Sequence, residues 1–104
     1  IITTTMHIEN KPVQELKGIV FGEVVEGRNF VERFMSGIRD IVGGRAVAMK
    51  DSLMNARKAA LDEMSQRASK LGANAIIGVS FQYSTVGAQN GMLMITCNGT
   101  AVVV

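Results

Sequence analysis

The apolar and β-branched residues in the first quarter of the chain fall into two segments that predict strands. Residues 1–6 are rich in β-branched side chains and predict a short strand. After a polar connection, residues 16–26 (LKGIVFGEVVE) predict a second strand. Successive side chains of a strand point to opposite faces, so one face of this strand is apolar except for a single carboxylate and comprises Ile19, Phe21, Glu23 and Val25.

Helical periodicity follows and predicts two helices. Apolar residues recur at helical spacing over residues 30–42, and the glycines Gly43 and Gly44 end this first helix. A second helix is expected from about residue 47 to residue 71. Gly72 follows it, where a left-handed C-terminal cap belongs. The apolar stripe of the second helix consists of Leu53, Ala56, Ala60, Met64, Ala68 and Leu71, with Leu61 beside it.

The last third of the chain returns to strand patterns. Residues 75–83 and 92–104 predict two strands, and residues 86–91 (VGAQNG) between them predict a hairpin turn. The expected order is ββααββ over residues 1–104. This order predicts a single α+β domain with an antiparallel sheet packed on helices.

The apolar positions exceed what two helices on one side of a sheet can cover. A sheet with one covered face should alternate apolar and polar residues, but residues 92–95 and 101–104 are continuously apolar. We expect the second face to be apolar and to carry Met92, Met94, Ile76 and Val102. An exposed surface of that kind usually marks an interface, which predicts self-association. The alternative is that one helix covers each face.

Composition and charge narrow the function classes. The net charge is +2, with 19% charged residues, no run of basic residues and no tryptophan, which argues against a nucleic-acid site. The sequence contains no apolar run long enough to span a membrane. The single cysteine is compatible with a reducing compartment, and we expect a cytoplasmic protein.

Soft metal ligands are scarce. Cys97 and His7 are the only thiol and imidazole, and they form no CxxC or HxxxH pattern, so one subunit cannot build a closed site from them. A ring of subunits could bring several copies of Cys97 together. The alternative is a small buried residue, since Cys97 shares a strand face with Ile95 and Leu93. We expect the seven methionines to serve packing or interfaces.

Two further positions are candidate ligand-binding or interface sites. Gly43, Gly44 and Arg45 could offer backbone N–H groups and a guanidinium to a phosphate or carboxylate, or they could form an ordinary turn between helices. Glu23 is a carboxylate on an otherwise apolar strand face, where it needs a partner. An arginine of another subunit would meet that need. With a single histidine, no catalytic triad or dyad can be assembled, and we expect a protein without enzymatic activity.

Several segments together resemble the YbjQ-like family, which carries the description "putative heavy-metal-binding" and is largely uncharacterised. They are IITTT at the start, GIVFGEVVEG (18–27), IRDIVGGR (38–45), ARKAALDEMSQRASKLGANAIIGVSF (56–81) and GTAVVV (99–104). The resemblance implies a dodecin-like subunit fold and a ring-shaped homopentamer. The leading hypothesis is a non-catalytic oligomer that binds a metal ion or small ligand at subunit interfaces. The main alternative is a structural or regulatory assembly that engages another protein.

Overall fold

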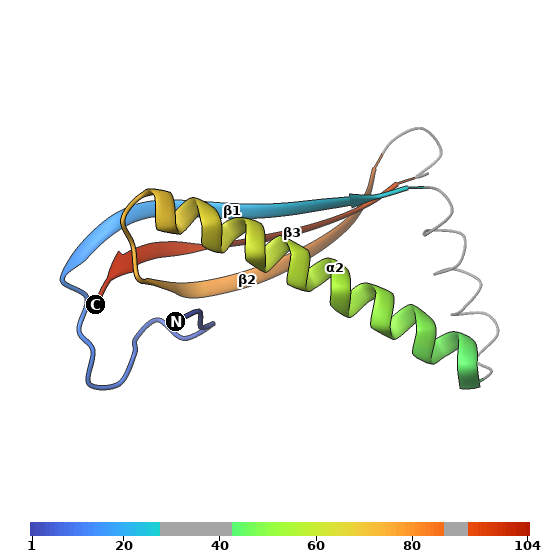
Figure 1. Cartoon of the computed structure of the whole chain (residues 1–104), viewed down its shortest axis with the longest axis horizontal. Coiled ribbons are helices and arrows are strands. Elements are labelled where there is room, and N and C mark those ends of the chain that lie inside the picture. The colour runs from blue at the N-terminus through green and yellow to red at the C-terminus, as the bar shows by residue number, and fades with distance from the viewer. Residues whose placement is uncertain (28–42, 87–91) are drawn as a thin grey trace.

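The computed structural model describes residues 1–27, 43–86 and 92–104. Its elements are β1 (Glu15–Glu26), α2 (Gly43–Lys70), β2 (Ala75–Val86) and β3 (Met92–Val103), with one helix packed on one antiparallel sheet (Figure 1). The predicted α+β class is therefore confirmed. The helix expected over residues 30–42 lies outside the described residues, and so does most of the predicted hairpin turn.

The three strands are antiparallel in the order β1-β3-β2. The three predicted strands are confirmed, although β2 runs to Val86, three residues further than expected. The short strand predicted over residues 1–6 is reduced to a single parallel bridge between Ile2 and Ile76. Backbone hydrogen bonds from Ile76 N–H to Ile1 and from Thr3 N–H to Ile76 extend this contact. The N-terminal segment thus covers the outer edge of β2 over its first residues.

Helix α2 packs on one face of the sheet through a stripe of small residues. Ala56, Ala60, Met64 and Ala68 recur at intervals of four and are all buried. The first residues of α2 diverge from the sheet, as Figure 1 shows. Within the described residues, no helix is apolar and long enough to cross a membrane.

Glycines let the backbone of α2 come unusually close to the sheet. A Cβ on Gly22 in β1 would collide with the carbonyl oxygen of Ala60 and lie 3.0 Å from the Cys97 sulfur. On β3, a Cβ on Gly99 would lie 2.6 Å from a methyl carbon of Ile76. The contact of α2 with the sheet is close-packed at Gly22, and the sheet itself is close-packed at Gly99, so no larger residue fits at either position without movement.

The C-terminal end of α2 confirms the predicted cap. Gly72 has φ = 84°, the left-handed region that glycine adopts without steric cost. The N–H of Ala73 donates to the carbonyl of Ala68, and the N–H of Gly72 donates to that of Ser69. These two bonds are the Schellman motif. Leu71, which was expected in the buried stripe, is exposed because it lies beyond the last helical residue.

The N-terminal end of α2 corrects the prediction. Gly43 and Gly44 were expected to end one helix and form a turn, but they are the first residues of α2, which begins four residues earlier than predicted. Glycine costs only about 1 kcal/mol relative to alanine in a helix, so two of them do not prevent a 28-residue helix from starting there.

The expected exposed face is also corrected. Ile76 belongs to the helix-side core, and Val102 is fully covered by a small cluster with Ala75 and Ile77, against which Ile8 and Val104 pack. Met92 and Met94 do lie on the face away from α2, where Met92 is exposed and Met94 is half-buried. The larger exposed group on this open face is the β1 apolar row, Leu16, Ile19, Phe21 and Val25.

The close approach at Gly22 leads to a stability prediction. Gly22→Ala should lower the free energy of unfolding by about 1–3 kcal/mol, because α2 must move to accept the methyl group. Gly27→Ala is the matched control, since a Cβ there meets no atom of the described residues within 4 Å. Urea unfolding followed by circular dichroism measures both. Equal stability of the two variants would contradict the packing described here.

Candidate functional site

Glu23 lies on the open face of the sheet, in the middle of the β1 apolar row. Its cross-strand neighbour on β3 is Thr96, and Gln82 on β2 lies directly beyond Thr96. Glu23 is exposed, so within one chain its carboxylate is in contact with water. Helix α2 covers the opposite face of β1, so the predicted ligand-binding or interface role of Glu23 stays a prediction.

Polar side chains continue from Glu23 across the other two strands. In the next row, Asn98 on β3 pairs with Ser80 on β2, and their Oδ1 and Oγ atoms are 3.0 Å apart. We call these residues the polar strip: Glu23, Thr96, Gln82, Asn98 and Ser80. It presents one carboxylate, two amides and two hydroxyls on the same side of the sheet, next to the apolar row.

Sequence reasoning found only Glu23 of this set. The other four members lie on β3 and β2, and only the strand register brings them to the same side of the sheet as Glu23. The signal in the sequence was the alternation of polar residues at Ser80, Gln82 and Ser84, which marks a water-facing side of β2.

Cys97 lies on the other side of the sheet, in the core beneath α2. Its side chain is 0% exposed and belongs to the cluster that contains Val20, Ala60 and Met64. Burial raises the pKa of the Cys97 thiol above its ordinary value of 9.0, a hydrogen bond with the Gly22 backbone acts against this, and nearby Glu63 adds to it. The thiolate that binds metals is therefore disfavoured at this position.

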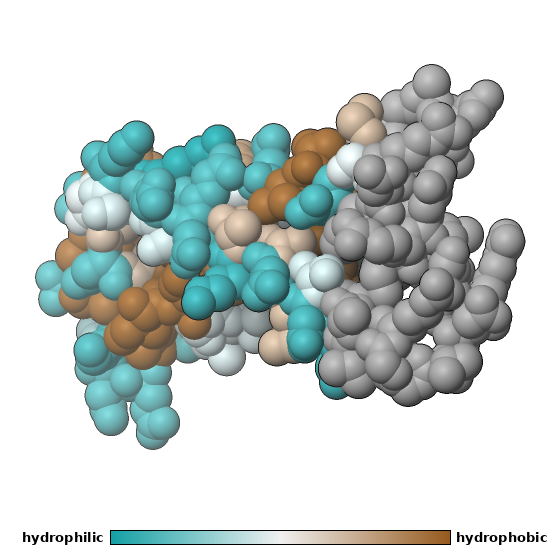
Figure 2. Space-filling model, turned by 45° about the vertical axis from the view of Figure 1, so that its right-hand side comes forward, coloured by the Kyte–Doolittle hydropathy of each residue, from teal (hydrophilic) through white to brown (hydrophobic). Residues whose placement is uncertain are grey.

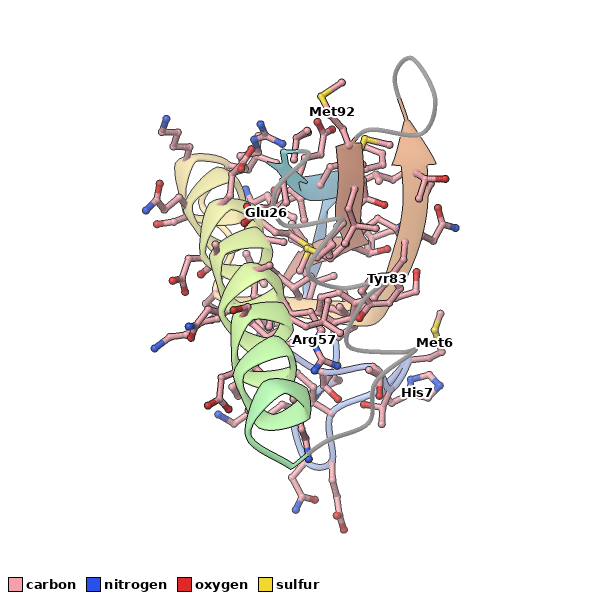
Figure 3. All side chains as sticks on the ribbon, turned by 90° about the vertical axis from the view of Figure 1, so that its right-hand side faces the viewer. Met6, His7, Glu26, Arg57, Tyr83 and Met92 are labelled. Atoms are coloured by element: carbon pink, nitrogen blue, oxygen red, sulfur yellow. The ribbon has the colours of Figure 1, made fainter. Side chains whose placement is uncertain are left out.

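The described residues of one chain do not fit a heavy-metal ion. Among residues 1–27, 43–86 and 92–104, no three His, Cys, Asp or Glu side chains come together as a metal site. His7 is exposed on the N-terminal segment, and Figure 3 shows it far from Met92 at the start of β3. Another subunit could reach Cys97 only if α2 moved away from the sheet. Metal ligation by Cys97 stays a prediction.

Gly43, Gly44 and Arg45 form the first turn of α2. Their predicted role in binding a phosphate or carboxylate stays a prediction. The side chain of Arg45 and the residues that precede Gly43 lie outside the described part of the chain. The structure does not bring these three residues together with Glu23 or Cys97.

Arg67 has a role that sequence reasoning missed. Its Nη1 donates a 2.8 Å hydrogen bond to the backbone carbonyl of Phe21 in β1, and its Nη2 pairs with Glu63, one turn earlier on α2. The sequence signal was the Glu–Arg pair at i, i+4 on the polar helix face. That pattern alone does not indicate a bond to a strand.

A shallow depression of about 210 Å³ lies near the N-terminus, between the C-terminal turn of α2 and the start of β2. Its lining side chains are apolar, hydroxyl or amide groups, and none is Asp, Glu, His, Lys, Arg or Cys. The described residues also bury no polar or charged side chain.

Comparisons with known proteins agree with this fold. A family described as "putative heavy-metal-binding" matches residues 1–104. A UPF0145 protein of Listeria ivanovii is 52% identical over 104 residues, covering 100% of this chain and 94% of that protein. A UPF0145 protein of Listeria welshimeri is 51% identical over the same length and coverage. A crystal structure of a DUF74-family protein of unknown function from Pediococcus pentosaceus has a TM-score of 0.65 at 14% identity, covering 100% of this chain and 96% of that one. This last similarity shows the fold alone.

The buried thiol leads to a prediction about pH. Because the folded chain holds the Cys97 proton to higher pH than the unfolded chain, this group's contribution to stability is complete below pH 9.0 and is lost as the pH rises through the raised pKa. The free energy of unfolding of the native chain should therefore fall more steeply between about pH 8 and about pH 10 than that of Cys97→Ala.

Urea unfolding at both pH values measures this difference, and every other titrating group is common to the two chains. Parallel pH profiles would contradict the burial of the thiol. Cys97→Ala should also leave any stoichiometric metal in place, which elemental analysis of the purified chain can check.

Proposed function

The chain belongs to the YbjQ-like family, and from its open sheet face we propose that it is a non-catalytic subunit of a homo-oligomer that binds a cation or small cationic ligand between subunits. The observation that carries the proposal is the difference between the two faces of β1. Val20, beneath α2, is 3% exposed, whereas Ile19 on the open face is 70% exposed.

The β1 apolar row supports association with another copy. Leu16, Ile19, Phe21 and Val25 lie on one side of a single strand, and all four are exposed. Apolar side chains gathered in this way are rare on the surface of a monomer and usually mark a protein interface. By contrast, the side of the molecule seen in Figure 2 is mostly hydrophilic, with separate hydrophobic patches. Five copies are the number that the family resemblance implies.

The polar strip supports a ligand at the same surface. If a second copy covers the open face, Glu23 loses water and needs a positive partner, because an unpaired buried carboxylate is strongly unfavourable. Thr96 is its cross-strand neighbour on β3, Asn98 lies two residues further along β3, and Gln82 lies beyond Thr96 on β2. Oxygen ligands of these kinds suit a hard cation or a cationic organic group.

The flat apolar row also favours a second candidate function. The same surface would suit an assembly that engages another protein without any small ligand. The two candidates differ in whether the isolated oligomer carries or takes up a ligand at Glu23, which native mass spectrometry distinguishes.

The first prediction concerns assembly. The native chain should form one defined oligomer, and Ile19→Lys combined with Phe21→Lys should reduce its mass by at least half, because two charges cannot be buried in the apolar row. Asn55→Lys combined with Gln66→Lys on the exposed side of α2 is the control with the same added charge and should leave the mass unchanged. Light scattering after size exclusion gives the masses. A native chain that is monomeric at every concentration would reject the proposal.

The second prediction concerns the ligand. Native mass spectra taken with added Mn²⁺, Zn²⁺ or Cd²⁺ should show one ion bound per subunit, and Glu23→Gln should weaken this binding at least tenfold. Glu26→Gln is the matched control, because Glu26 lies on the same strand but on the opposite face. An oligomer that stays bare with all three ions would reject cation binding and leave the scaffold function.

A further inference from the structure

β1 is a twelve-residue strand with β3 on one side and no described strand on the other. An edge strand of this length offers unpaired N–H and C=O groups to any strand that approaches it. Arg67 reaches the carbonyl of Phe21, so the backbone groups of Phe21 point away from β3. Residues two apart share a direction, so those of Ile19, Glu23 and Val25 point outward as well.

Arg67 occupies the middle of this edge. Its guanidinium donates to the Phe21 carbonyl at 2.8 Å while its other amino group pairs with Glu63. A hydrogen bond from a charged donor is stronger than the backbone bond that an incoming strand would offer in its place. An added strand must therefore displace the Arg67 side chain, which Glu63 holds in position.

The first residues of β1 are protected from strand addition in a different way. The register with β3 shifts between Leu16 and Gly18, where Gly18 has φ = 126°, and Lys17 in the bulge pairs with Glu15 at 2.9 Å. Bulges and charged side chains on an edge interrupt the regular spacing that strand addition needs. The regular part of the edge is thus limited to residues 19–25, with Arg67 at its centre.

We propose that Arg67, held by Glu63, prevents a second copy of the chain from adding a strand to β1, so that copies associate through the open face and not through the edge. The inference rests on the proposed self-association for the identity of the partner. It adds that copies associate through the open face and that the edge of β1 is blocked. Association through a defined face can close, whereas strand addition can repeat from copy to copy without end.

Arg67→Ala tests this inference. Compared with the native chain, this variant should shift from one defined mass to larger species, and its thioflavin T fluorescence should rise several-fold at equal concentration. Arg67→Lys keeps a positive donor and should give a smaller effect. Hydrogen exchange should show new protection in the larger species at the amides of Ile19, Glu23 and Val25.

Met64→Ala is the control for a simple loss of stability. It removes a buried side chain from the same part of α2 but leaves the contact between Arg67 and Phe21 in place. The variants are compared in urea at equal fractions of unfolded chain. The inference is overturned if Arg67→Ala keeps the mass and the thioflavin T fluorescence of the native chain. It is also overturned if Met64→Ala forms larger species to the same extent as Arg67→Ala at matched stability.

Self-association through the open face and the blocking role of Arg67 can be rejected independently of each other. A monomeric native chain rejects self-association through the open face, whereas growth of Arg67→Ala from that monomer would still support the blocked edge. A native oligomer that dissociates on substitution of the apolar row, together with an Arg67→Ala variant that does not grow, rejects only the role of Arg67.

Discussion

The contact of the α2 backbone with β1 at Gly22 determines much of this structure. It brings the Ala60 carbonyl onto the strand, so α2 covers the face that carries Val20 and Gly22. Three consequences follow from this one contact. Cys97 is enclosed beneath the helix, the apolar row of β1 is left open on the other side, and Arg67 comes within reach of the Phe21 carbonyl.

Local patterns predicted most of the elements, but they do not determine which face of β1 the helix covers. The strands and the Gly72 cap depend on residues close in sequence, so alternation and a single glycine were enough to place them. The face of β1 that α2 covers depends on how closely two backbones can approach. The more hydrophobic face, with Ile19 and Phe21, remained open because the face with Gly22 allows closer packing.

The difference between local patterns and contacts of distant segments also applies to the candidate sites. Glu23 was singled out as a charge on an apolar strand face, and in the structure it lies exposed on the open face of the sheet. Its polar neighbours Thr96 and Gln82 could not be predicted, because their proximity depends on strand register across segments far apart in the chain. The spacing of Cys97 with Ile95 and Leu93 did predict a buried strand face, and all three are buried.

Self-association as proposed places another copy of the chain over the open face. Maleimide labelling of Ile19→Cys in a Cys97→Ala background tests it most directly, because the new thiol replaces a side chain that is 70% exposed in one chain. We expect slow labelling at concentrations where the oligomer forms and fast labelling on dilution to single chains. Equally fast labelling at both concentrations would contradict it.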